Sequence, residues 1–281
     1  MNMKVGTLYI VGTPIGNLED MTFRAIKTLS EVDLIAAEDT RVTKNLLSHF
    51  KIPTETISYH RHSNKKREDE IISLLVDGKN IALVTDAGMP AISDPGYELV
   101  QRATQENINV IPIPGVSAPI TALSVSGFNS DKFLFLGFLP RSKKDIVKLV
   151  EPTLSTNPPI CVVAFEAPHR IAKTLTILNE LSPDMQIVIA RELTKKFEEI
   201  IRGTATELAE KIQDLKGEIV LIWLPTPIDN NILAASEFLT ALEYAKNELK
   251  NGESIKTASQ KAKEKYNVSK KDIYNNLLKE D

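Results

Sequence analysis

The stretch "NIALVTDAGMPAISDPG" (residues 80–96) joins a short apolar run to a turn region that holds two aspartates, two glycines and two prolines. An apolar run of this length, without polar alternation, indicates a strand covered on both faces, as in a parallel sheet between layers of helices. The turn that follows contains no lysine, so it does not match a phosphate-binding loop. A ligand at this strand end would therefore meet carboxylates and rigid backbone.

Runs of the same kind recur through the first half of the chain and alternate with helical periodicity. The predicted strands are 7–12, 32–38, 55–60, 80–86 and 109–115, and the predicted helices are 21–30, 42–50, 64–76 and 97–105. This alternation predicts an α/β domain with an open, parallel, five-stranded sheet. In such sheets ligands bind beyond the carboxyl ends of the strands, so the loops at those ends are the candidate site.

A second set of strands follows in the second half of the chain. Its predicted members are 133–140, 160–167, 186–193, 198–203 and 218–225. The connection between the third and fourth is too short for a crossover helix, so we expect one antiparallel pair and a mixed sheet. The Gly/Ser-rich segment 124–132 marks a boundary, which gives two α/β domains, residues 1–123 and 124–228.

The last part of the chain, residues 229–281, carries no strand signal and is predicted to be a small helical domain. Its helices are expected at 232–249, 254–266 and 271–278, each of the last two opened by a serine of capping type. The final pair resembles a helix-turn-helix, and lysines cluster between Lys256 and Lys271. Two interpretations stay open: an appendage that packs on the body or on a dimer mate, and a contact for nucleic acid.

Composition narrows the class of protein. With 42% hydrophobic and 25% charged residues and a net charge of −3, the 281-residue chain is typical of globular proteins and is not broadly basic. The single Cys161 excludes an intramolecular disulfide and a cysteine-based metal cluster, and its place in "ICVVAF" predicts a buried structural thiol. We expect a cytoplasmic location, with no metal site and no secretory signal. We also expect no membrane span, because no apolar run approaches ~20 residues.

The other strand ends of the first domain offer competing interpretations. "GTPIGN" (12–17) lacks the spacing of a dinucleotide fingerprint, although its glycines would let backbone approach a ligand. "AAEDTR" (36–41) crowds charges where Asp39 or Thr40 could simply cap a helix. "YHRHSNKKR" (59–67) is a local cationic patch, either solvated or facing RNA phosphates. In "PIPGVSAPITAL" (112–123), Ser117 could cap a helix, or the small residues could leave room for a flat ligand.

In the second domain, "AFEAPHRI" (164–171) places an acid, an imidazole and a cation together at a strand end, and "ARELTKKFEE" (190–199) adds another dense set of charges. The sequence contains neither the G-x-S-x-G nor the H-E-x-x-H signature of hydrolases.

Several long blocks, in order from about Val5 to Pro225, resemble the ribosomal RNA small subunit methyltransferase I family of the tetrapyrrole methylase (class III) superfamily. They are "GTLYIVGTPIGNLEDMTFRAIKTLSEVDLIAAEDTRVTKNLLSHF", "VTDAGMPAISDPG", "IPGVSA", "FLGFLPR" and "FEAPHRI". The resemblance implies a homodimer that uses S-adenosylmethionine to methylate the 2′-oxygen of a cytidine in the decoding region of 16S rRNA. It also implies a cofactor cleft between the two α/β domains, of tetrapyrrole-methylase type.

The resemblance further implies the residues that contact the cofactor, which carries a sulfonium but no phosphate. The implied contacts are Thr13, Pro14, Asp86, Ala87, Gly88, Met89, Ser117, Ala118 and Phe165. We expect Asp86 to matter for cofactor binding. Ser93 or Asp94 is expected instead to cap the next helix, with Pro95 in its first turn, so we expect Asp94 to matter for stability.

For chemistry, a positioned base should assist a ribose hydroxyl. We expect it to be Asp39 or Glu166, with Glu38 and His169 as alternates. The expected RNA contacts are Arg41, His60, Arg61, Lys66, Arg141 and Arg170, because lysine and arginine pair well with phosphate. Two rival functions stay open: a tetrapyrrole methyltransferase of the same fold, which the lysine-rich tail disfavours, and a non-enzymatic nucleic-acid-binding regulator, which the repeated cofactor-type turns disfavour.

Overall fold

The computed structural model describes residues 5–61, 65–156, 158–226 and 230–278, and it divides into two compact units. The first unit comprises Met1–Thr153 and Ile160–Pro225, and the second comprises Leu154–Pro159 and Thr226–Asp281. The first predicted α/β domain falls in the first unit, as does the second except for residues 154–159 and 226–228, and the predicted junction at residues 228 and 229 lies outside the described residues. We keep the three-domain division as a proposal.

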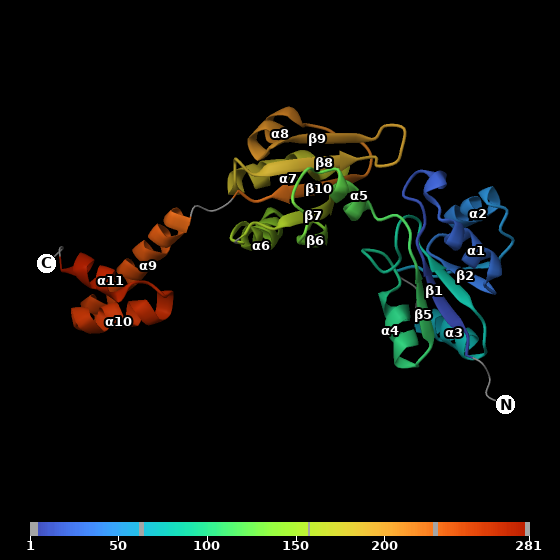
Figure 1. Ribbon diagram of the computed structural model, residues 1–281, viewed down its shortest axis with the longest axis horizontal. Helices are drawn as coiled ribbons and strands as arrows, with labels where there is room; N and C mark the ends of the chain where they lie inside the picture. The colour runs from blue at the N-terminus through green and yellow to red at the C-terminus, as the bar shows by residue number, and fades with distance from the viewer. Residues whose placement is uncertain (1–4, 62–64, 157, 227–229, 279–281) are drawn as a thin grey trace. The chain divides into compact units, whose positions relative to one another are not determined.

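The first sheet is parallel and has the order β3-β2-β4-β1-β5 (Figure 1). Its strands are β1 (Thr7–Val11), β2 (Leu34–Ala37), β3 (Thr56–Ser58), β4 (Ile81–Val84) and β5 (Asn109–Ile113). Its helices are η1 (Leu18–Asp20), α1 (Phe23–Glu31), α2 (Thr40–His49), α3 (Lys65–Val76), α4 (Tyr97–Gln105) and α5 (Ala118–Ser124). The predicted five-stranded parallel sheet is confirmed.

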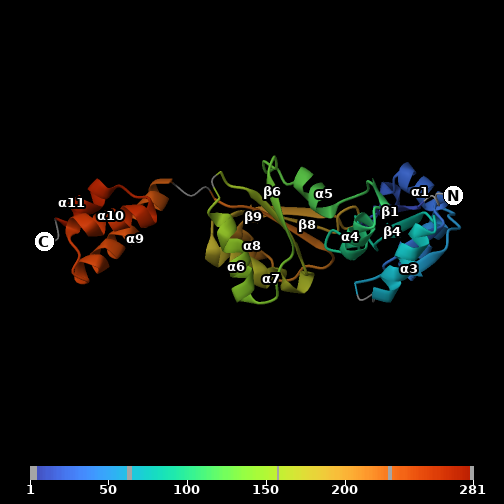
Figure 2. The ribbon, with the colours of Figure 1, turned by 90° about the horizontal axis from the view of Figure 1, so that it is seen from below.

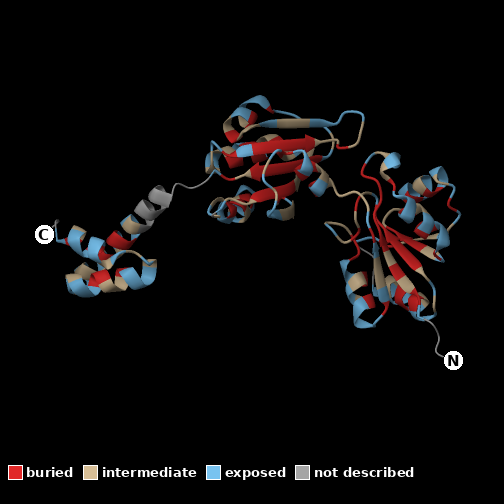
Figure 3. Cartoon of the chain, viewed as in Figure 1, coloured by how far each residue is buried: buried red, intermediate tan, exposed pale blue. Residues whose placement is uncertain are grey.

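Strand β4 is buried on both faces, as its unbroken apolar run predicts. Ile81 and Leu83 pack into one hydrophobic cluster, whereas Ala82 and Val84 pack into another. Figure 3 shows the resulting band of buried residues along the strands of this sheet. Because both faces are covered, the ends of the strands are where a ligand can reach the sheet.

The second sheet is mixed and has the order β6-β7-β10-β8-β9 (Figure 1), and Figure 2 gives a second view of it. Its strands are β6 (Phe133–Phe138), β7 (Cys161–Glu166), β8 (Gln186–Arg191), β9 (Glu199–Thr204) and β10 (Ile219–Leu224), and its helices are α6 (Lys143–Leu154), η2 (Pro168–Arg170), α7 (Ile171–Leu181) and α8 (Ala205–Lys211). Strands β8 and β9 are antiparallel, as predicted, and only β6 and β7 pair in parallel among the described strands of this sheet. Cys161 is fully buried, and burial raises its thiol pKa to about 11, which confirms a structural thiol.

The second unit contains α9 (Asn230–Lys250), α10 (Ile255–Tyr266) and α11 (Lys270–Leu277). The two predicted serine caps are confirmed, since Ser254 accepts the N–H of Thr257 and Ser269 accepts that of Asp272. A small core of alanines with Ile273 and Leu277 holds the three helices together. Among the residues that the structure describes, no helix combines the length and the hydrophobicity that crossing a bilayer demands.

The predicted cap of α4 is wrong, although the helix begins at Tyr97 as its predicted range has it. Pro95 lies before the helix, and the N-cap is Gly96, which has a φ of 136° and provides no capping side chain. Ala91 and Ser93 also have positive φ angles, 68° and 65°. The chain therefore turns repeatedly before the helix, which removes Asp94 from the cap position and leaves its side chain for another role.

Candidate functional site

The loops after β1 and β4 are tied together at the carboxyl edge of the first sheet. The N–H of Thr13 donates to the carbonyl of Gly88 at 2.9 Å, and the N–H of Gly88 donates back at 3.0 Å. The Thr13 hydroxyl donates to the carbonyl of Thr85 at 2.9 Å, and Thr13 is only 3% exposed. Thr13 therefore fastens the two loops, with all of these groups occupied by protein partners.

The glycine that precedes Thr13 has a packing role. A Cβ at Gly12 would lie 2.7 Å from the Cα of Gly115 and 2.7 Å from the sulfur of Met89. Gly16, the other glycine of this loop, lies against the side chain of Lys195, 2.5 Å from where a Cβ would be. Both glycines permit close approach, as expected, but to other parts of the chain.

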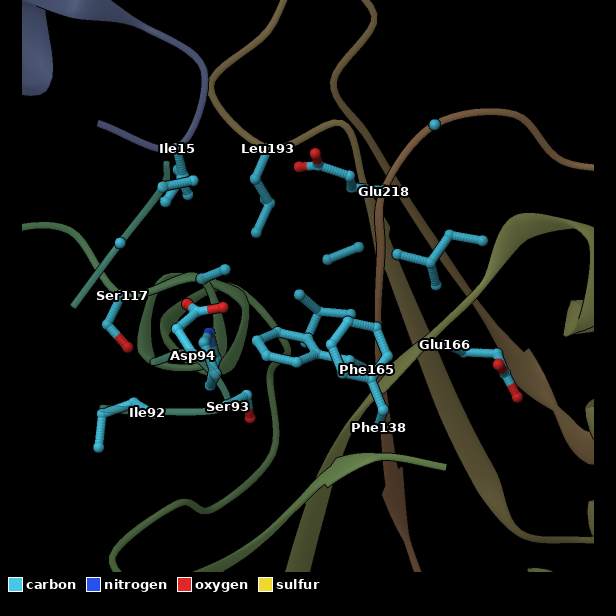
Figure 4. A pocket seen from close by; sticks show the side chains of 18 of the residues that line it. Ile15, Ile92, Ser93, Asp94, Ser117, Phe138, Phe165, Glu166, Leu193 and Glu218 are labelled. Atoms are coloured by element: carbon cyan, nitrogen blue, oxygen red, sulfur yellow. The ribbon is translucent and has the colours of Figure 1, made fainter. Parts of the chain in front are cut away.

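These loops border a cavity of about 660 Å³ (Figure 4). This size is ordinary for a site that holds a cofactor or small ligand. The expected cofactor contacts that line it are Asp86, Ala87, Gly88, Met89, Ser117, Ala118 and Phe165. Among the described lining residues, Ile15 occupies the place expected for Thr13 and Pro14. Seven of the nine expected contacts thus meet at one cavity.

The second sheet supplies lining residues that the sequence did not predict. They are Phe138 on β6, then Ala190, Glu192, Leu193 and Lys195 at and after the end of β8, and Gly217 to Val220 at the start of β10. Because β10 runs antiparallel to β7, its beginning lies beside the end of β7. Sequence patterns reveal strands but not their order, so only the charge density of residues 190–199 hinted at this wall.

The lysine of this wall is already neutralised. The Nζ of Lys195 lies 3.1 Å from a carboxylate oxygen of Glu192 and 3.1 Å from one of Glu218. The backbone N–H of Glu218, followed by Lys195, keeps the Glu192 pKa below its usual value despite partial desolvation. The lining therefore includes a cluster of one lysine and two carboxylates rather than an anion-binding lysine.

The loops after β2 and β4 bring three carboxylates to the cavity, those of Glu38, Asp86 and Asp94. Asp86 Oδ1 accepts the N–H of Asp39 at 3.1 Å, and Glu38 Oε2 accepts the N–H of Asp86 at 3.3 Å. Burial raises the pKa of Asp86, and it raises that of half-buried Asp94 to about 6, with repulsion from Glu38 and Asp86 adding and Arg61 opposing. Glu38, Asp86 and Asp94 all line the cavity, which therefore presents negative charge.

Asp39, expected as a base, has a structural task. It is the N-cap of α2 and accepts the N–H of Arg41 at 2.8 Å. The guanidinium of Arg41 grips the same carboxylate, with Nη2 to Oδ2 at 2.6 Å and Nε to Oδ1 at 3.1 Å, which lowers the Asp39 pKa to about 2. A carboxylate with so low a pKa accepts protons poorly.

Glu166, the other expected base, is 2% exposed and fully engaged. Its carboxylate accepts the N–H of Ala167 at 2.6 Å and the hydroxyl of Thr174 at 2.5 Å, and it forms an ion pair with Arg170. Figure 4 shows the carboxylate directed away from the rings of Phe138 and Phe165. Glu166 is therefore part of the cavity lining, but its carboxylate is committed to protein partners.

The expected RNA contacts separate into two groups. Arg170 is committed to Glu166 and to the carbonyls of Leu139 and Pro140, at 3.0 and 3.2 Å. Arg61 reaches the cavity loop and donates to the carbonyl of Ser93 at 2.8 Å. The other expected contacts, Arg41, His60, Lys66 and Arg141, are exposed, as is the alternate base His169, and none of these is among the described lining residues. His62 to Asn64 lie outside the described residues.

Comparison with known proteins identifies the family. A family model for Tetrapyrrole (Corrin/Porphyrin) Methylases matches residues 7–209. The chain is 45% identical over 278 residues to "Ribosomal RNA small subunit methyltransferase I" of Halalkalibacterium halodurans, covering 96% of this chain and 94% of that protein. The protein of the same name from Bacillus subtilis is 44% identical over 277 residues, covering 96% and 93%. The chain belongs to the ribosomal RNA small subunit methyltransferase I family of tetrapyrrole methylases.

Solved structures agree with the fold of this family. Diphthine synthase superposes with a TM-score of 0.62 at 15% identity, covering 78% of this chain and 90% of that one. Uroporphyrin-III C-methyl transferase from Thermus thermophilus, complexed with S-adenyl homocysteine, superposes with a TM-score of 0.56 at 17% identity, covering 78% and 97%. At these identities the likeness establishes the two-sheet fold.

As a member of this methyltransferase family, the chain uses S-adenosylmethionine as its cofactor. The cavity fits that molecule chemically. Its cationic sulfonium and ammonium groups suit the carboxylates of Glu38, Asp86 and Asp94, its flat adenine suits the small residues Ser117 and Ala118, and it has no phosphate that would require a free lysine. We propose that the expected contacts of this cavity hold the cofactor, with Ile15 in place of Thr13 and Pro14.

Proposed function

We propose that this chain methylates the 2′-oxygen of a cytidine in the decoding region of 16S rRNA, in the cytoplasm and as a homodimer. The names of its relatives support the small ribosomal subunit as the substrate. The single observation that carries the chemical part is the carboxylate-lined cavity, which fits a cationic cofactor and is open to a second reactant.

The cofactor supplies a methyl group that is already activated by the neighbouring sulfonium. The chain must therefore align the ribose oxygen, exclude water and accept a proton. The apolar wall of Ile15, Phe165 and Leu193 excludes water from one side of the cavity. The loops after β1 and β4 are held rigid by the paired hydrogen bonds between Thr13 and Gly88, so the lining keeps its geometry.

Asp94 is the carboxylate that we assign to proton acceptance. It lines the cavity and is half-buried, and its hydrogen-bonding capacity is not consumed by a helix cap as that of Asp39 is. Its pKa of about 6 lets it be ionised at neutral pH yet still bind a proton usefully. Glu38, the alternate predicted from the sequence, also lines the cavity and contributes to the charge that tunes Asp94.

Exposed cations and an exposed strand edge support the proposed partners. Arg61 at the cavity loop, with Lys66 and Arg141, would hold RNA phosphates, whereas Arg170 is committed to the fold. Strand β6 forms an edge of its sheet and leaves Phe133 and Leu134 exposed. An exposed apolar edge strand of this kind supports a contact with a second copy.

Ribose methylation in rRNA from cells with and without this protein tests the proposal. Nuclease digestion and mass spectrometry should show one 2′-O-methylcytidine of 16S rRNA that disappears on deletion and returns with the wild-type gene but not with Asp94→Asn. An unchanged 16S rRNA would refute the rRNA assignment. In that case, methylation of a porphyrinoid by the purified protein would establish the tetrapyrrole alternative.

A further inference from the structure

Phe138 is a solvent-exposed aromatic residue at the cavity. The residue is 62% exposed although it lines the same cavity as the expected cofactor contacts. Its ring centroid lies 5.1 Å from that of Phe165, and Phe165 in turn makes an edge contact with Phe135 at 5.2 Å. Figure 4 shows the rings of Phe138 and Phe165 together in the cavity. One side of Phe138 is thus supported, and much of the ring is left without cover.

A local irregularity in β6 aims this ring. The pairing of β6 with β7 shifts register between Phe135 and Phe138, and Gly137 has a φ of 65°. A bulge of this type redirects the following side chain and is common beside active sites. A Cβ at Gly137 would lie 3.4 Å from the hydroxyl of Ser93, so the glycine also brings β6 close to the loop that carries Asp94.

The backbone after Phe138 is firmly fixed. The N–H of buried Leu139 donates to the carbonyl of Phe165 at 3.1 Å. The guanidinium of Arg170 donates to the carbonyls of Leu139 and Pro140, and Glu166 holds Arg170 in place. The buried ion pair of Glu166 and Arg170 therefore fixes the backbone that carries the ring, which reduces the entropy lost when a flat ligand packs on it.

We propose that Phe138 is the stacking platform for the nucleobase of the nucleotide that is methylated. This inference rests on the proposed function. An RNA base whose ribose must reach a cavity has to leave its stack, and unstacked bases are commonly received on aromatic side chains. Ile92, which also lines the cavity and is 53% exposed, adds apolar surface, and Arg61 lies close enough to Ser93 to meet a flanking phosphate.

The occupant follows from the position of the ring. Phe138 lies at a cavity that also contains Asp94, the proposed proton acceptor, so the group that covers the ring should belong to the reacting molecule. A second copy of the chain is the alternative cover, since Phe133 and Leu134 of the same strand are exposed. Shape separates the two: a base needs a flat π face, whereas a protein contact needs only apolar volume.

Three substitutions of Phe138 and one control test the platform. Phe138→Ala removes the ring, Phe138→Leu keeps apolar volume without a π face, and Phe138→Tyr keeps the ring. Phe23→Ala, at a phenylalanine that is 93% exposed on α1 and is not among the described lining residues, is the matched control. Each variant is assayed for methyl transfer to purified small subunits, S-adenosylhomocysteine binding by calorimetry, and mass by light scattering.

The Ala and Leu variants should both need ~5- to 150-fold more small subunit for half-maximal transfer, the range typical for loss of one stacked base. Phe138→Tyr and Phe23→Ala should stay within about twofold of wild type by the same measure, and cofactor-product binding should change much less than RNA use. Normal activity of the Leu variant, or a loss of the dimer in the Ala variant, would assign the ring to a protein contact. If the wild type transfers no methyl group to small subunits, the proposed function fails and the platform fails with it. If the wild type is active and the Ala and Leu variants are equally active, the platform alone fails.

Discussion

The carboxylate of Glu166 and the guanidinium of Arg170 form an ion pair behind the cavity wall, and that pair fixes the backbone next to Phe138. Glu166 has a fully buried side chain, and Thr174 and the N–H of Ala167 complete its hydrogen bonds. The pair connects η2 with the end of β6 through the carbonyls of Leu139 and Pro140. The acid that sequence alone suggested as a catalyst therefore acts on the shape of the site.

Removing this carboxylate should destabilise the protein strongly. Glu166→Ala leaves Arg170 partly buried without its partner, and breaking a buried pair in this way costs about 3–5 kcal/mol. Glu31→Ala, which breaks the exposed pair between Glu31 and Lys27, is the matched control and should cost less than about 1 kcal/mol. Urea unfolding measures both. Equal small losses would mean that the Glu166 pair is not the anchor described here.

Asp94→Asn should slow methyl transfer at saturating substrates while leaving S-adenosylhomocysteine binding largely intact. In the wild type, single-turnover rates should rise with pH up to about 6 and then level off, because the acceptor must be ionised. The variant should lose that rise. A wild-type rate that is flat between pH 5 and pH 7 would remove Asp94 from this role.

The same residue should also affect stability, with a definite sign. The folded-state pKa of Asp94 is raised from 3.8 to about 6, so folding disfavours its ionised form. The stability cost is absent below the unfolded pKa and grows as pH rises through about 6. Thermal melts should therefore show Asp94→Asn above wild type at neutral pH and equal to it below pH 3.8. A variant less stable at neutral pH would contradict the burial argument.

Asp86→Asn should weaken cofactor binding. Asp86 lines the cavity, and hydrogen bonds to charged groups contribute about 1.5–3 kcal/mol, or ~10- to 150-fold in affinity. Asp131→Asn, an exposed aspartate in the loop before β6, is the control and should bind normally. Calorimetry with S-adenosylhomocysteine makes the comparison, and equal affinities for the two variants would place the cofactor elsewhere.

Gly12→Ala should destabilise the junction of the β1 and β5 ends. The added Cβ would lie 2.7 Å from the Cα of Gly115, which is backbone and cannot swing aside. Overpacking of this kind costs about 1–3 kcal/mol or more. At Gly203 the nearest atom, at 2.9 Å, is the end of the Glu207 side chain, so Gly203→Ala should cost less. The two urea midpoints compare these costs directly.

The sequence predicted the sheets and much of the cavity because both depend on local signals. Apolar runs located the strands and marked the loops after β4 and β5 as the candidate site, and the family resemblance supplied Asp86 to Met89 and Ser117 within those loops. The wall from Lys195 and Gly217 to Val220 depends on the order of strands in a mixed sheet, which no local pattern encodes. The roles of Asp94 and Phe138 were also not predicted, because each depends on backbone geometry. Positive φ angles before α4 remove Asp94 from the cap position, and a register shift in β6 turns Phe138 outward.

The most direct test of the central claim is the position of the methyl group after single-turnover transfer from S-adenosylmethionine to purified small subunits. Nucleoside mass spectrometry should find the label on one 2′-O-methylcytidine of 16S rRNA, formed more slowly when Asp94 is changed to Asn. A methyl group on a base, on another nucleoside, or absent from RNA while the cofactor binds the cavity would contradict the account.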